Sequence, residues 1–236
     1  MSTERPNNAF LRALSDWDFA SVQPELTAVN LPLAQILYGP EQPIRALTIP
    51  TSGIVSFVVH LSTGDGVEAG MVGNDGIIGS SAVLNETMAL NTAIVQMLGA
   101  GLALDVGTAR KIAAASPNFR RAVYRHDQIL FLQAQQSIAC IAKHPLEARL
   151  CRWLLRCRDL AQNEKLSLTQ EFLAQMLGVQ RSTLSVTAHR LQAAGLIEYR
   201  RGNIRILNLE GIRESTCGCY GAIKELEGKL LSVAKN

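Results

Sequence analysis

Apolar and polar residues change their spacing near residues 31 and 105 of the chain. Before Leu31 we expect short helices, because Ser15 followed by the acidic Asp18 is typical of a helix start. From Leu31 to about Gly101, short apolar runs alternate with glycine-rich turns, which predicts an antiparallel sheet folded into a small barrel or roll. The runs are Ala34–Tyr38, Ile54–Leu61, Glu68–Val72 and Thr92–Leu98.

Two turns within this region are the strongest hairpin predictions, namely Gly64-Asp65-Gly66 and Asn74-Asp75-Gly76. Glycine and asparagine tolerate a positive φ, which the tightest hairpin turns require. We therefore expect each turn to join two neighbouring antiparallel strands.

After Asp105 the pattern is helical, and Ser116-Pro117 is typical of a helix start. The segment 117–143 contains neither glycine nor proline, and His144-Pro145 ends it, because proline disfavours the helical conformation of the preceding residue. We expect a hinge there. Apolar residues lie along one stripe of this long helix: Val123, Leu130, Ala134, Ile138 and Ile141.

This long helix allows two interpretations. It is a core helix, or it is partly exposed and a second copy of the chain covers its apolar stripe. A length greater than the diameter of its own domain favours the second interpretation.

The stretch LAQMLGVQRSTLS, from Leu173 to Ser185, predicts two helices that meet at a sharp turn. Thr169 is the expected N-cap of the first helix, and Gly178 supplies the left-handed residue of the turn. Residues 197–206 predict a hairpin with a basic tip. A helix pair followed by such a hairpin indicates a winged helix, whose second helix would enter the major groove of DNA.

Polar side chains near the start of that second helix would reach base edges, and the flanking arginines would hold phosphates. Arg181 can bond guanine with two hydrogen bonds. The competing interpretation is a face that is merely solvated. The predicted DNA-binding residues are Thr169, Gln180, Arg181, Ser182, Thr183, Ser185, His189, Arg190, Arg200, Arg201 and Arg205.

The charge is unevenly distributed. Residues 1–116 hold 5 Lys+Arg against 10 Asp+Glu and residues 117–236 hold 18 against 10, so a net charge of +3 divides into −5 and +8. The basic half is expected to meet a polyanion. A chain of 236 residues with 47% hydrophobic residues fits two globular domains. No apolar run could span a bilayer and no signal peptide is apparent, so we expect a cytoplasmic protein without a membrane partner.

The order of these parts resembles the Crp/Fnr family of bacterial transcription regulators over about residues 10–212. The segments that carry the resemblance are Val72–Gly79, Pro145–Leu155 and Thr169–Leu191. It implies an α+β fold with an N-terminal antiparallel β-roll like that of cyclic-nucleotide-binding domains, a long dimerisation helix and a C-terminal winged helix-turn-helix. The corresponding ranges are 1–116 for the roll as sensor domain, 117–143 for the long helix, 144–212 for the DNA-binding domain and 213–236 for a helical extension.

The resemblance also implies partners. Two subunits would pair through the long helix and bind a near-palindromic site in double-stranded DNA, and an activator would also contact RNA polymerase. The family usually places Arg, Glu and Arg on the reading helix, where this chain has Arg181, Ser182 and Val186. The target half-site is therefore expected to differ from the best-known ones.

By the same resemblance, an effector pocket would involve Gly76, Ile77, Gly79, Asn91 and Thr92. Members that bind cyclic AMP carry Gly-Glu-Leu and then an Arg-Ser pair, whereas here Ile77 follows Gly76, and Asn91 and Thr92 replace the pair. Residues 46–109 contain no Lys or Arg, so a buried phosphate would lack charge-assisted hydrogen bonds. Cyclic AMP is therefore disfavoured, although the glycine-rich turns and their backbone N–H groups keep it open.

The cysteines are Cys140, Cys151, Cys157, Cys217 and Cys219. An odd number without a CxxC pair fits reduced thiols rather than a disulfide framework or a zinc site. Cys217 and Cys219 could form a redox or metal element, but two thiols without further clustered ligands favour ordinary packing. We therefore expect no metal and no cofactor. The iron–sulfur members of the family use N-terminal cysteines that this chain lacks, and His60, His126 and His144 are interpreted as structural.

The sequence contains no paired nucleophile and base, no HExxH and no GxxxxGK phosphate loop, so we do not expect an enzyme. The hypothesis is a homodimeric, sequence-specific DNA-binding transcriptional regulator, whose roll controls the DNA-binding domains through the hinge without cyclic AMP. The alternative is a ligand-binding or protein-interaction module whose winged helix docks a protein. The sequence leaves open whether an effector exists and whether the protein activates or represses.

Overall fold

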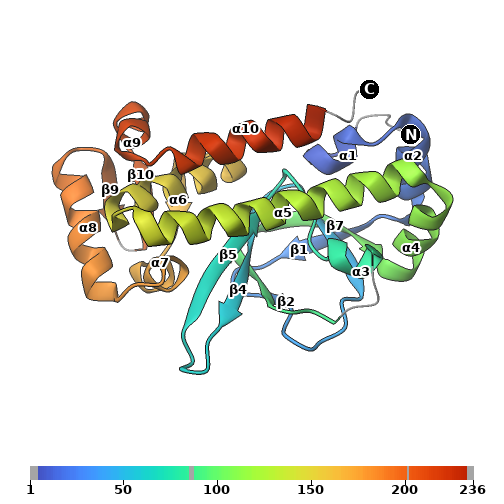
Figure 1. The fold of residues 1–236 in the computed structure, drawn as a ribbon, viewed down its shortest axis with the longest axis horizontal. Helices are drawn as coiled ribbons and strands as arrows, with labels where there is room; N and C mark the ends of the chain where they lie inside the picture. The colour runs from blue at the N-terminus through green and yellow to red at the C-terminus, as the bar shows by residue number, and fades with distance from the viewer. Residues whose placement is uncertain (1–4, 85–87, 201, 233–236) are drawn as a thin grey trace.

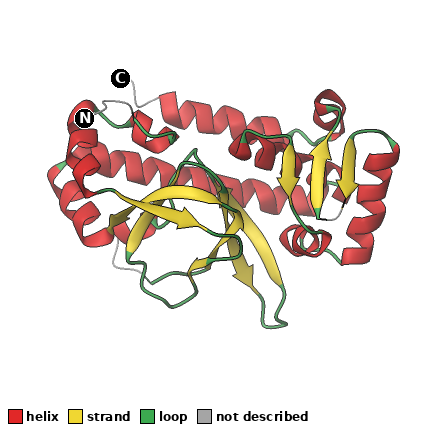
Figure 2. Ribbon diagram, turned by 180° about the vertical axis from the view of Figure 1, so that it is seen from behind, coloured by secondary structure: helices red, strands yellow, loops and turns green. Residues whose placement is uncertain are grey.

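The computed structural model describes residues 5–84, 88–200 and 202–232. An N-terminal roll of strands lies against one long helix, α5 (Pro117–Lys143), and a helical region with a small sheet follows it (Figure 1). Figure 2 shows the strands gathered in two places, the curved sheets of the roll and the small sheet beside the C-terminal helices. No helix in these ranges is long and apolar enough to cross a membrane.

The roll is built from two antiparallel sheets, with strand orders β1-β7-β3 and β2-β6-β4-β5. This confirms the predicted N-terminal antiparallel roll. The strands are β1 (Thr27–Leu31), β2 (Ile36–Tyr38), β3 (Ala46–Pro50), β4 (Ile54–His60), β5 (Gly66–Val72), β6 (Thr92–Met97) and β7 (Gly99–Asp105). The apolar runs predicted β2, β4, β5 and β6 but not β1, β3 and β7. Strand β3 is buried at four consecutive positions and β7 begins with glycines, so neither alternates clearly.

The two predicted hairpin turns differ in outcome. Gly64-Asp65-Gly66 joins β4 to β5, and Gly64 has a φ of +89°. The prediction for Asn74-Asp75-Gly76 was wrong, because the chain leaves the four-stranded sheet there and crosses to the other sheet. Ile78 then pairs with Thr48 of β3 through backbone hydrogen bonds of 2.7 and 3.0 Å. None of the three turn residues has a positive φ, which the tightest hairpin turns need.

Helices flank the roll, and two of them begin at the predicted caps. Ser15 Oγ accepts a hydrogen bond from the Asp18 amide at 3.1 Å, and Ser116 Oγ accepts one from the Phe119 amide at 3.1 Å. The helices of this half are α1 (Ala9–Ala13), α2 (Asp16–Val22), the short 3₁₀ turn Gln23–Glu25, α3 (Ser80–Leu84), α4 (Val106–Ala115) and α5.

One side of α5 is buried against the rest of the subunit and the other side is open. Of the predicted stripe only Val123 is buried, whereas Ile138 is 69% exposed and Ile141 is 45% exposed. Tyr124 and Phe131, fourteen and seven residues before Ile138, are 54% and 62% exposed. The predicted stripe therefore combined two faces, and an apolar seam with a seven-residue repeat remains uncovered within one subunit.

The C-terminal half contains a three-stranded sheet of order β8-β10-β9 and helices around it. Helix α10 lies alongside α5 (Figure 1), where Gln133 Nε2 donates a 3.0 Å hydrogen bond to Glu227 Oε1. The elements are α6 (Leu146–Ala161), β8 (Lys165–Ser167), α7 (Gln170–Leu177), α8 (Arg181–Ala193), β9 (Ile197–Arg200), β10 (Asn203–Ile206), α9 (Leu209–Ser215) and α10 (Cys219–Ser232). The sequence predicted the hairpin β9–β10 but not β8, the third strand of this sheet.

The largest hydrophobic core among the described residues crosses the expected boundary between the roll and the C-terminal half. Ile54, Val58 and Met71 of the roll pack in the same cluster as Trp153 and Leu154 of α6, and all five are at most 4% exposed. The two halves are therefore packed against each other through buried side chains, rather than being joined by the hinge alone.

Candidate nucleic-acid interface

The turn between α7 and α8 has the predicted geometry. Thr169 Oγ1 accepts a hydrogen bond from the Phe172 amide at 3.2 Å, which confirms Thr169 as the N-cap. Gly178 has a φ of +63°, the left-handed region that favours glycine, and Val179 N–H donates to Ala174 O at 3.0 Å. Two helices thus meet at a sharp angle with their backbone groups satisfied.

The inner faces of α7 and α8 are apolar and closely packed. Leu173 and Leu177 of α7 and Leu184 and Leu191 of α8 are at most 3% exposed. The small side chain of Ala174 lets the two helices approach closely. Because this face is fixed inward, the polar face of α8 must point outward, at the end of the molecule remote from α1 and α2 (Figure 1).

Most predicted base-contacting residues lie on that outward face. Ser185 is half-buried, and its Oγ donates a 2.7 Å hydrogen bond to Gln170 Oε1, so it also positions α7 against α8. Helix α8 contains two arginines, one histidine and no acidic residue. The exposed predicted residues on or beside it are Gln180, Arg181, Ser182, Thr183, His189 and Arg190.

The predicted phosphate contacts of the wing are less uniform. Arg200 is exposed at the end of β9, and Arg201 lies outside the described residues. Arg205 Nε is 3.3 Å from Glu198 Oε2 across the β9–β10 pair, with both side chains about half exposed. Exposed pairs of this kind contribute little and exchange readily. Arg205 could therefore reach phosphate only by leaving Glu198.

The predicted effector residues do not form one pocket. Gly79 and Asn91 line a cavity of about 340 Å³ between the four-stranded sheet and α5, whereas Gly76, Ile77 and Thr92 lie elsewhere. A Cβ on Gly76 would lie 2.0 Å from His126 Cε1 of α5, so this glycine serves close packing.

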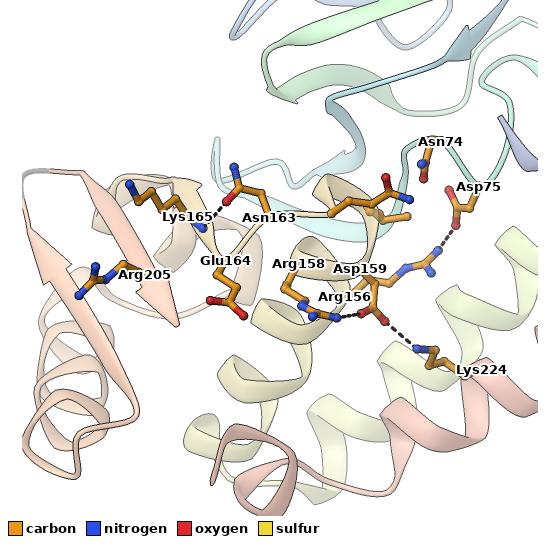
Figure 3. Close-up of a pocket in the computed structure, with 12 residues that line it drawn as sticks. Asn74, Asp75, Arg156, Arg158, Asp159, Asn163, Glu164, Lys165, Arg205 and Lys224 are labelled. Atoms are coloured by element: carbon orange, nitrogen blue, oxygen red, sulfur yellow. Dashed lines mark hydrogen bonds and ion pairs between the residues drawn. The ribbon is translucent and has the colours of Figure 1, made fainter. Parts of the chain in front are cut away.

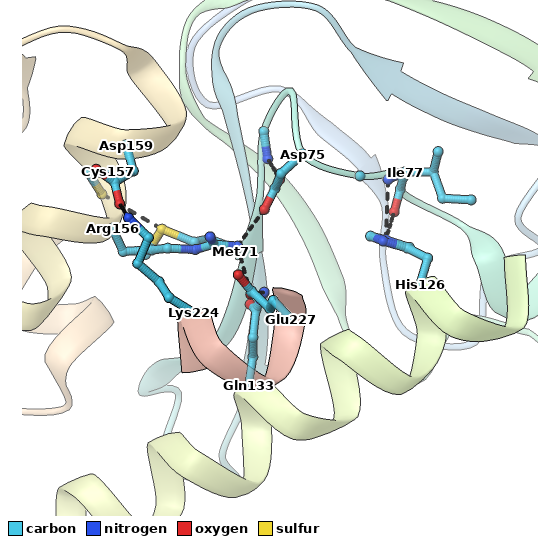
Figure 4. Close-up of polar contacts among 12 residues, drawn as sticks. Met71, Asp75, Ile77, His126, Gln133, Arg156, Cys157, Asp159, Lys224 and Glu227 are labelled. Carbon is cyan, nitrogen blue, oxygen red and sulfur yellow. Dashed lines mark hydrogen bonds and ion pairs between the residues drawn. The ribbon is translucent and has the colours of Figure 1, made fainter. Parts of the chain in front are cut away.

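Ile77 and Thr92 are held by histidines. His126 Nε2 lies 2.7 Å from Ile77 O (Figure 4), and His60 Nε2 lies 3.1 Å from Thr92 Oγ1 in an apolar cavity beside α7. Burial lowers the pKa of His126, so its ring is neutral near pH 7. These contacts support the structural interpretation of His126.

The charge of the Gly79–Asn91 cavity disfavours a phosphate. Asp127 of α5 is the only charged residue among the described residues that line it, and its Oδ1 accepts a 2.9 Å hydrogen bond from Ser80 Oγ. Anionic phosphate would meet a carboxylate without a neighbouring cation.

Two arginines of α6 contact other parts of the subunit instead of facing water. Arg156 Nη2 lies 2.5 Å from Asp75 Oδ2 in the roll and 3.5 Å from Glu227 Oε1 in α10 (Figure 4). Burial lowers the pKa of Arg156, but Asp75 and Glu227 raise it more, so the guanidinium keeps its charge. Arg149 donates a hydrogen bond to Leu177 O at the end of α7. Arg156 therefore holds α6 against the roll and α10, and Arg149 holds α6 against the end of α7.

Glu68 of β5 also joins the roll to α6. Its Oε1 accepts a 3.0 Å hydrogen bond from Trp153 Nε1, and its Oε2 accepts one of 2.7 Å from Ser56 Oγ. Burial raises the pKa of Glu68 to about 7, although Ser56 and Trp153 lower it by bonding the carboxylate. A group that titrates near neutral pH thus lies in the contact between the two halves.

An open cavity of about 890 Å³ lies between the roll, α6 and the wing (Figure 3). Its cations are largely paired with its carboxylates. Asp159 Oδ2 accepts hydrogen bonds from Tyr220 Oη at 2.6 Å and from Lys224 Nζ at 2.8 Å, and Asp75 binds Arg156. Four of the five cationic side chains that line it are already paired with carboxylates, so an anion would have to compete with these pairs.

The structure overturns the reason for expecting no metal site. Cys217 and Cys219 are joined by Cys140 and His144 from the end of α5, and the four ligand atoms all lie within 4.8 Å of one another. Sequence reasoning missed this cluster because 77 residues separate Cys140 from Cys217. The signal available was the Cys140–His144 spacing of four, which places two side chains on one helix face.

Comparison with known proteins supports the same architecture. Residues 148–215 match the model of the Crp-like helix-turn-helix domain. The fold is similar to FixK2 from Bradyrhizobium japonicum, with a TM-score of 0.69 at 16% identity over 81% of this chain and 98% of that one. It is also similar to a Crp/Fnr transcriptional regulator from Thermus thermophilus, with a TM-score of 0.67 at 19% identity over 80% and 97%.

A third similar structure is the c-di-GMP-responsive global regulator CLP from Xanthomonas campestris, with a TM-score of 0.67 at 14% identity over 82% of this chain and 100% of that one. No curated protein matches the sequence. At these identities the similarity establishes the fold, and the residues of this chain must decide the rest.

Proposed function

Because the chain carries a Crp-like helix-turn-helix domain on the fold of the Crp/Fnr transcriptional regulators, we propose that it is a homodimeric, sequence-specific DNA-binding regulator. The outward face of α8 carries this proposal, since it is polar, contains no acidic residue and follows a tight glycine turn. Arg181 and its polar neighbours would read base edges, and Arg190 and Arg200 would hold phosphates. Such a protein would act in the cytoplasm, where the DNA is.

The proposed dimer forms through α5. Tyr124, Phe131 and Ile138 recur every seven residues on its open side, and Ala134 and Ile141 lie beside them. Two copies of this seam would cover each other as in a coiled coil. Pairing through α5 would present two α8 helices to a near-palindromic site, as two-fold symmetry requires.

We further propose that control runs through the contacts between roll and DNA-binding half. The shared core around Trp153 and the ion pair of Arg156 with Asp75 make the position of α6 dependent on the roll. A signal would shift a two-state equilibrium of this arrangement by binding one state better. Asp127 in the Gly79–Asn91 cavity argues against a cyclic nucleotide as that signal. RNA polymerase would be a partner if the protein activates.

The test is selection of random duplex DNA by the full chain at physiological salt, with and without cyclic AMP. Enrichment of an inverted repeat without nucleotide supports the proposal. Enrichment only with cyclic AMP would overturn the argument from the cavity charge, and no enrichment under either condition would contradict DNA reading by this protein.

The alternative is a module whose winged helix docks a protein. The salt dependence of the affinity distinguishes this alternative from DNA binding. Each phosphate that the protein neutralises releases counterions, so affinity for DNA falls steeply as salt increases. The basic outward face of α8 favours DNA.

A further inference from the structure

We propose that Cys140, His144, Cys217 and Cys219 form a tetrahedral zinc site that fixes the hinge between α5 and the DNA-binding half. The four ligand atoms come from two segments far apart in the sequence, the end of α5 and the connection between α9 and α10. Each segment supplies two ligands. Three thiolates and one imidazole are a ligand set typical of structural zinc.

The distances fit a single metal ion. Cys140 Sγ lies 3.5 Å from Cys217 Sγ, and Cys219 Sγ lies 3.6 Å from His144 Nδ1. Zinc–sulfur bonds of about 2.3 Å at tetrahedral angles place two sulfurs about 3.8 Å apart. All four ligand atoms lie within 4.8 Å of one another, which is at most about 1 Å more than this tetrahedral separation. A cluster with several iron atoms would hold its cysteines farther apart, so the geometry favours one ion.

Burial makes the site closed. Cys140 is fully buried, Cys217 and Cys219 are 7% and 5% exposed, and His144 is half-buried. Four protein ligands leave no position for water or substrate, which is the arrangement of a structural site rather than a catalytic one. Soft thiolates in tetrahedral geometry also select zinc over magnesium or calcium.

Neighbouring polar groups match the charge of the proposed complex. Three thiolates and Zn²⁺ carry a net charge of −1, and Gln136 Nε2 donates a 3.1 Å hydrogen bond to Cys219 Sγ. Arg152 acts electrostatically on Cys140, and its Nε is buried without a hydrogen-bond partner among the described residues. Cys219 is also the first residue of α10, where the helix dipole stabilises negative charge.

The position of the site gives it a consequence. His144 is the residue before Pro145, and Cys140 lies one helical turn earlier, so the metal would connect the end of α5 to the start of α10 across the hinge. Zinc would restrict the angle between the long helix and the DNA-binding half. Only the effect of this restriction on DNA binding rests on the proposed function, because zinc binding itself requires no DNA.

The first experiment measures metal binding by the reduced full chain. Wild type, Cys219→Ser and His144→Ala are purified with a phosphine reductant, zinc is measured by mass spectrometry, and Co²⁺ is added as a spectroscopic probe. Cys157→Ser is the matched control, because Cys157 is equally buried but contacts Gln96 and Met71 instead of the cluster. Circular dichroism checks that each variant is folded.

We expect one zinc per chain in wild type and in Cys157→Ser, with the intense cobalt spectrum of a tetrahedral thiolate site. Cys219→Ser and His144→Ala should bind zinc at least about 100-fold more weakly, since loss of an outer-shell partner alone costs 10- to 100-fold. If Cys219→Ser does not fold, the zinc affinity of His144→Ala tests the site. Competition between wild type and a chromophoric chelator measures the zinc affinity without any variant.

Two results would overturn the zinc site. One is a folded, reduced wild type that binds Zn²⁺ and Co²⁺ no better than His144→Ala. The other is a chain that takes up no metal but forms a Cys140–Cys217 disulfide on mild oxidation, which would make the cluster a redox pair. If zinc binds and DNA selection fails, the site stands and the proposed function fails.

Discussion

Two junctions connect the C-terminal half to the rest of the subunit, and they are built from different chemistry. The charged junction contains Glu68, Asp75, Arg156 and Glu227 and joins the roll, α6 and α10. Figure 4 shows Arg156 between Asp75 and Glu227. The thiol junction contains Cys140, His144, Cys217 and Cys219 and joins the end of α5 to the α9–α10 connection. Both cross the same boundary.

The difference lies in what each junction responds to. A carboxyl group with its pKa near 7 makes the charged junction sensitive to protons. Soft ligands within 4.8 Å of one another make the thiol junction sensitive to metal. The two junctions share no residue, so each can be changed by substitution without altering the residues of the other.

Loss of the central cation should have the largest effect on stability. Arg156→Met leaves Asp75 and Glu227 without the guanidinium that pairs with both, and breaking a largely buried pair in this way costs up to about 5 kcal/mol. Denaturant unfolding measures the change. Arg213→Met is the control, because its pair with Glu210 is exposed and should contribute less than about 1 kcal/mol. Equal costs for both variants would contradict the importance of the charged junction.

Metal should have the next largest effect, through the thiol junction. At a free zinc concentration about 1,000 times the dissociation constant, a ligand that binds only the folded chain stabilises it by about 4 kcal/mol. We expect zinc to raise the denaturation midpoint of wild type and of Arg156→Met alike, and a chelator to reverse the rise. A zinc response that disappears in Arg156→Met would show that the two junctions are not independent.

Protons should act through Glu68 with a defined sign. The folded carboxyl holds its proton up to about pH 7, whereas an ordinary carboxyl loses it near pH 4.5, so the unfolded state binds fewer protons between these values. Stability should therefore fall as pH rises through this window, by at most about 1.4 kcal/mol per pH unit. Glu68→Gln keeps an acceptor for Trp153 and should remove this contribution. An unchanged pH slope in the variant would contradict the assignment.

His126 provides an internal contrast with Glu68. Its pKa is lowered by burial, so it contributes stability above its ordinary pKa of 6.5 that is lost as the pH falls. The pH slopes from the two residues therefore have opposite signs, and only the slope from Glu68 should vanish in Glu68→Gln.

Reading of DNA should be separable from both junctions, with the smallest effect on stability. Arg181→Ala changes an exposed residue, so its unfolding free energy should shift by less than about 0.5 kcal/mol. Its affinity for the selected site should fall by about 1–3 kcal/mol, with relaxed preference at one base pair. Titration of selected and altered duplexes measures both quantities. A uniform loss on all sequences would instead assign Arg181 to phosphate.

Local patterns determined much of this protein. The bounds of α5 follow from Ser116-Pro117 and His144-Pro145, and the α7–α8 turn follows from Thr169 and Gly178, because caps, prolines and left-handed glycines act on neighbouring residues. The same locality placed the polar face of α8. Local composition gave a wrong prediction for Asn74-Asp75-Gly76. These residues suit a hairpin turn, but the chain crosses there from one sheet to the other.

Only the tertiary structure decided which distant groups meet. Arg156 pairs with Asp75 and Glu227 rather than water, Gly76 is needed by His126, and Cys140 lies beside Cys217. No spacing rule connects residues 50 to 81 positions apart, because their contact depends on how the helices and sheets pack. The sequence by itself therefore determined helix α8 and its polar face, whereas the two junctions between the roll, α5 and the C-terminal half arise from packing alone.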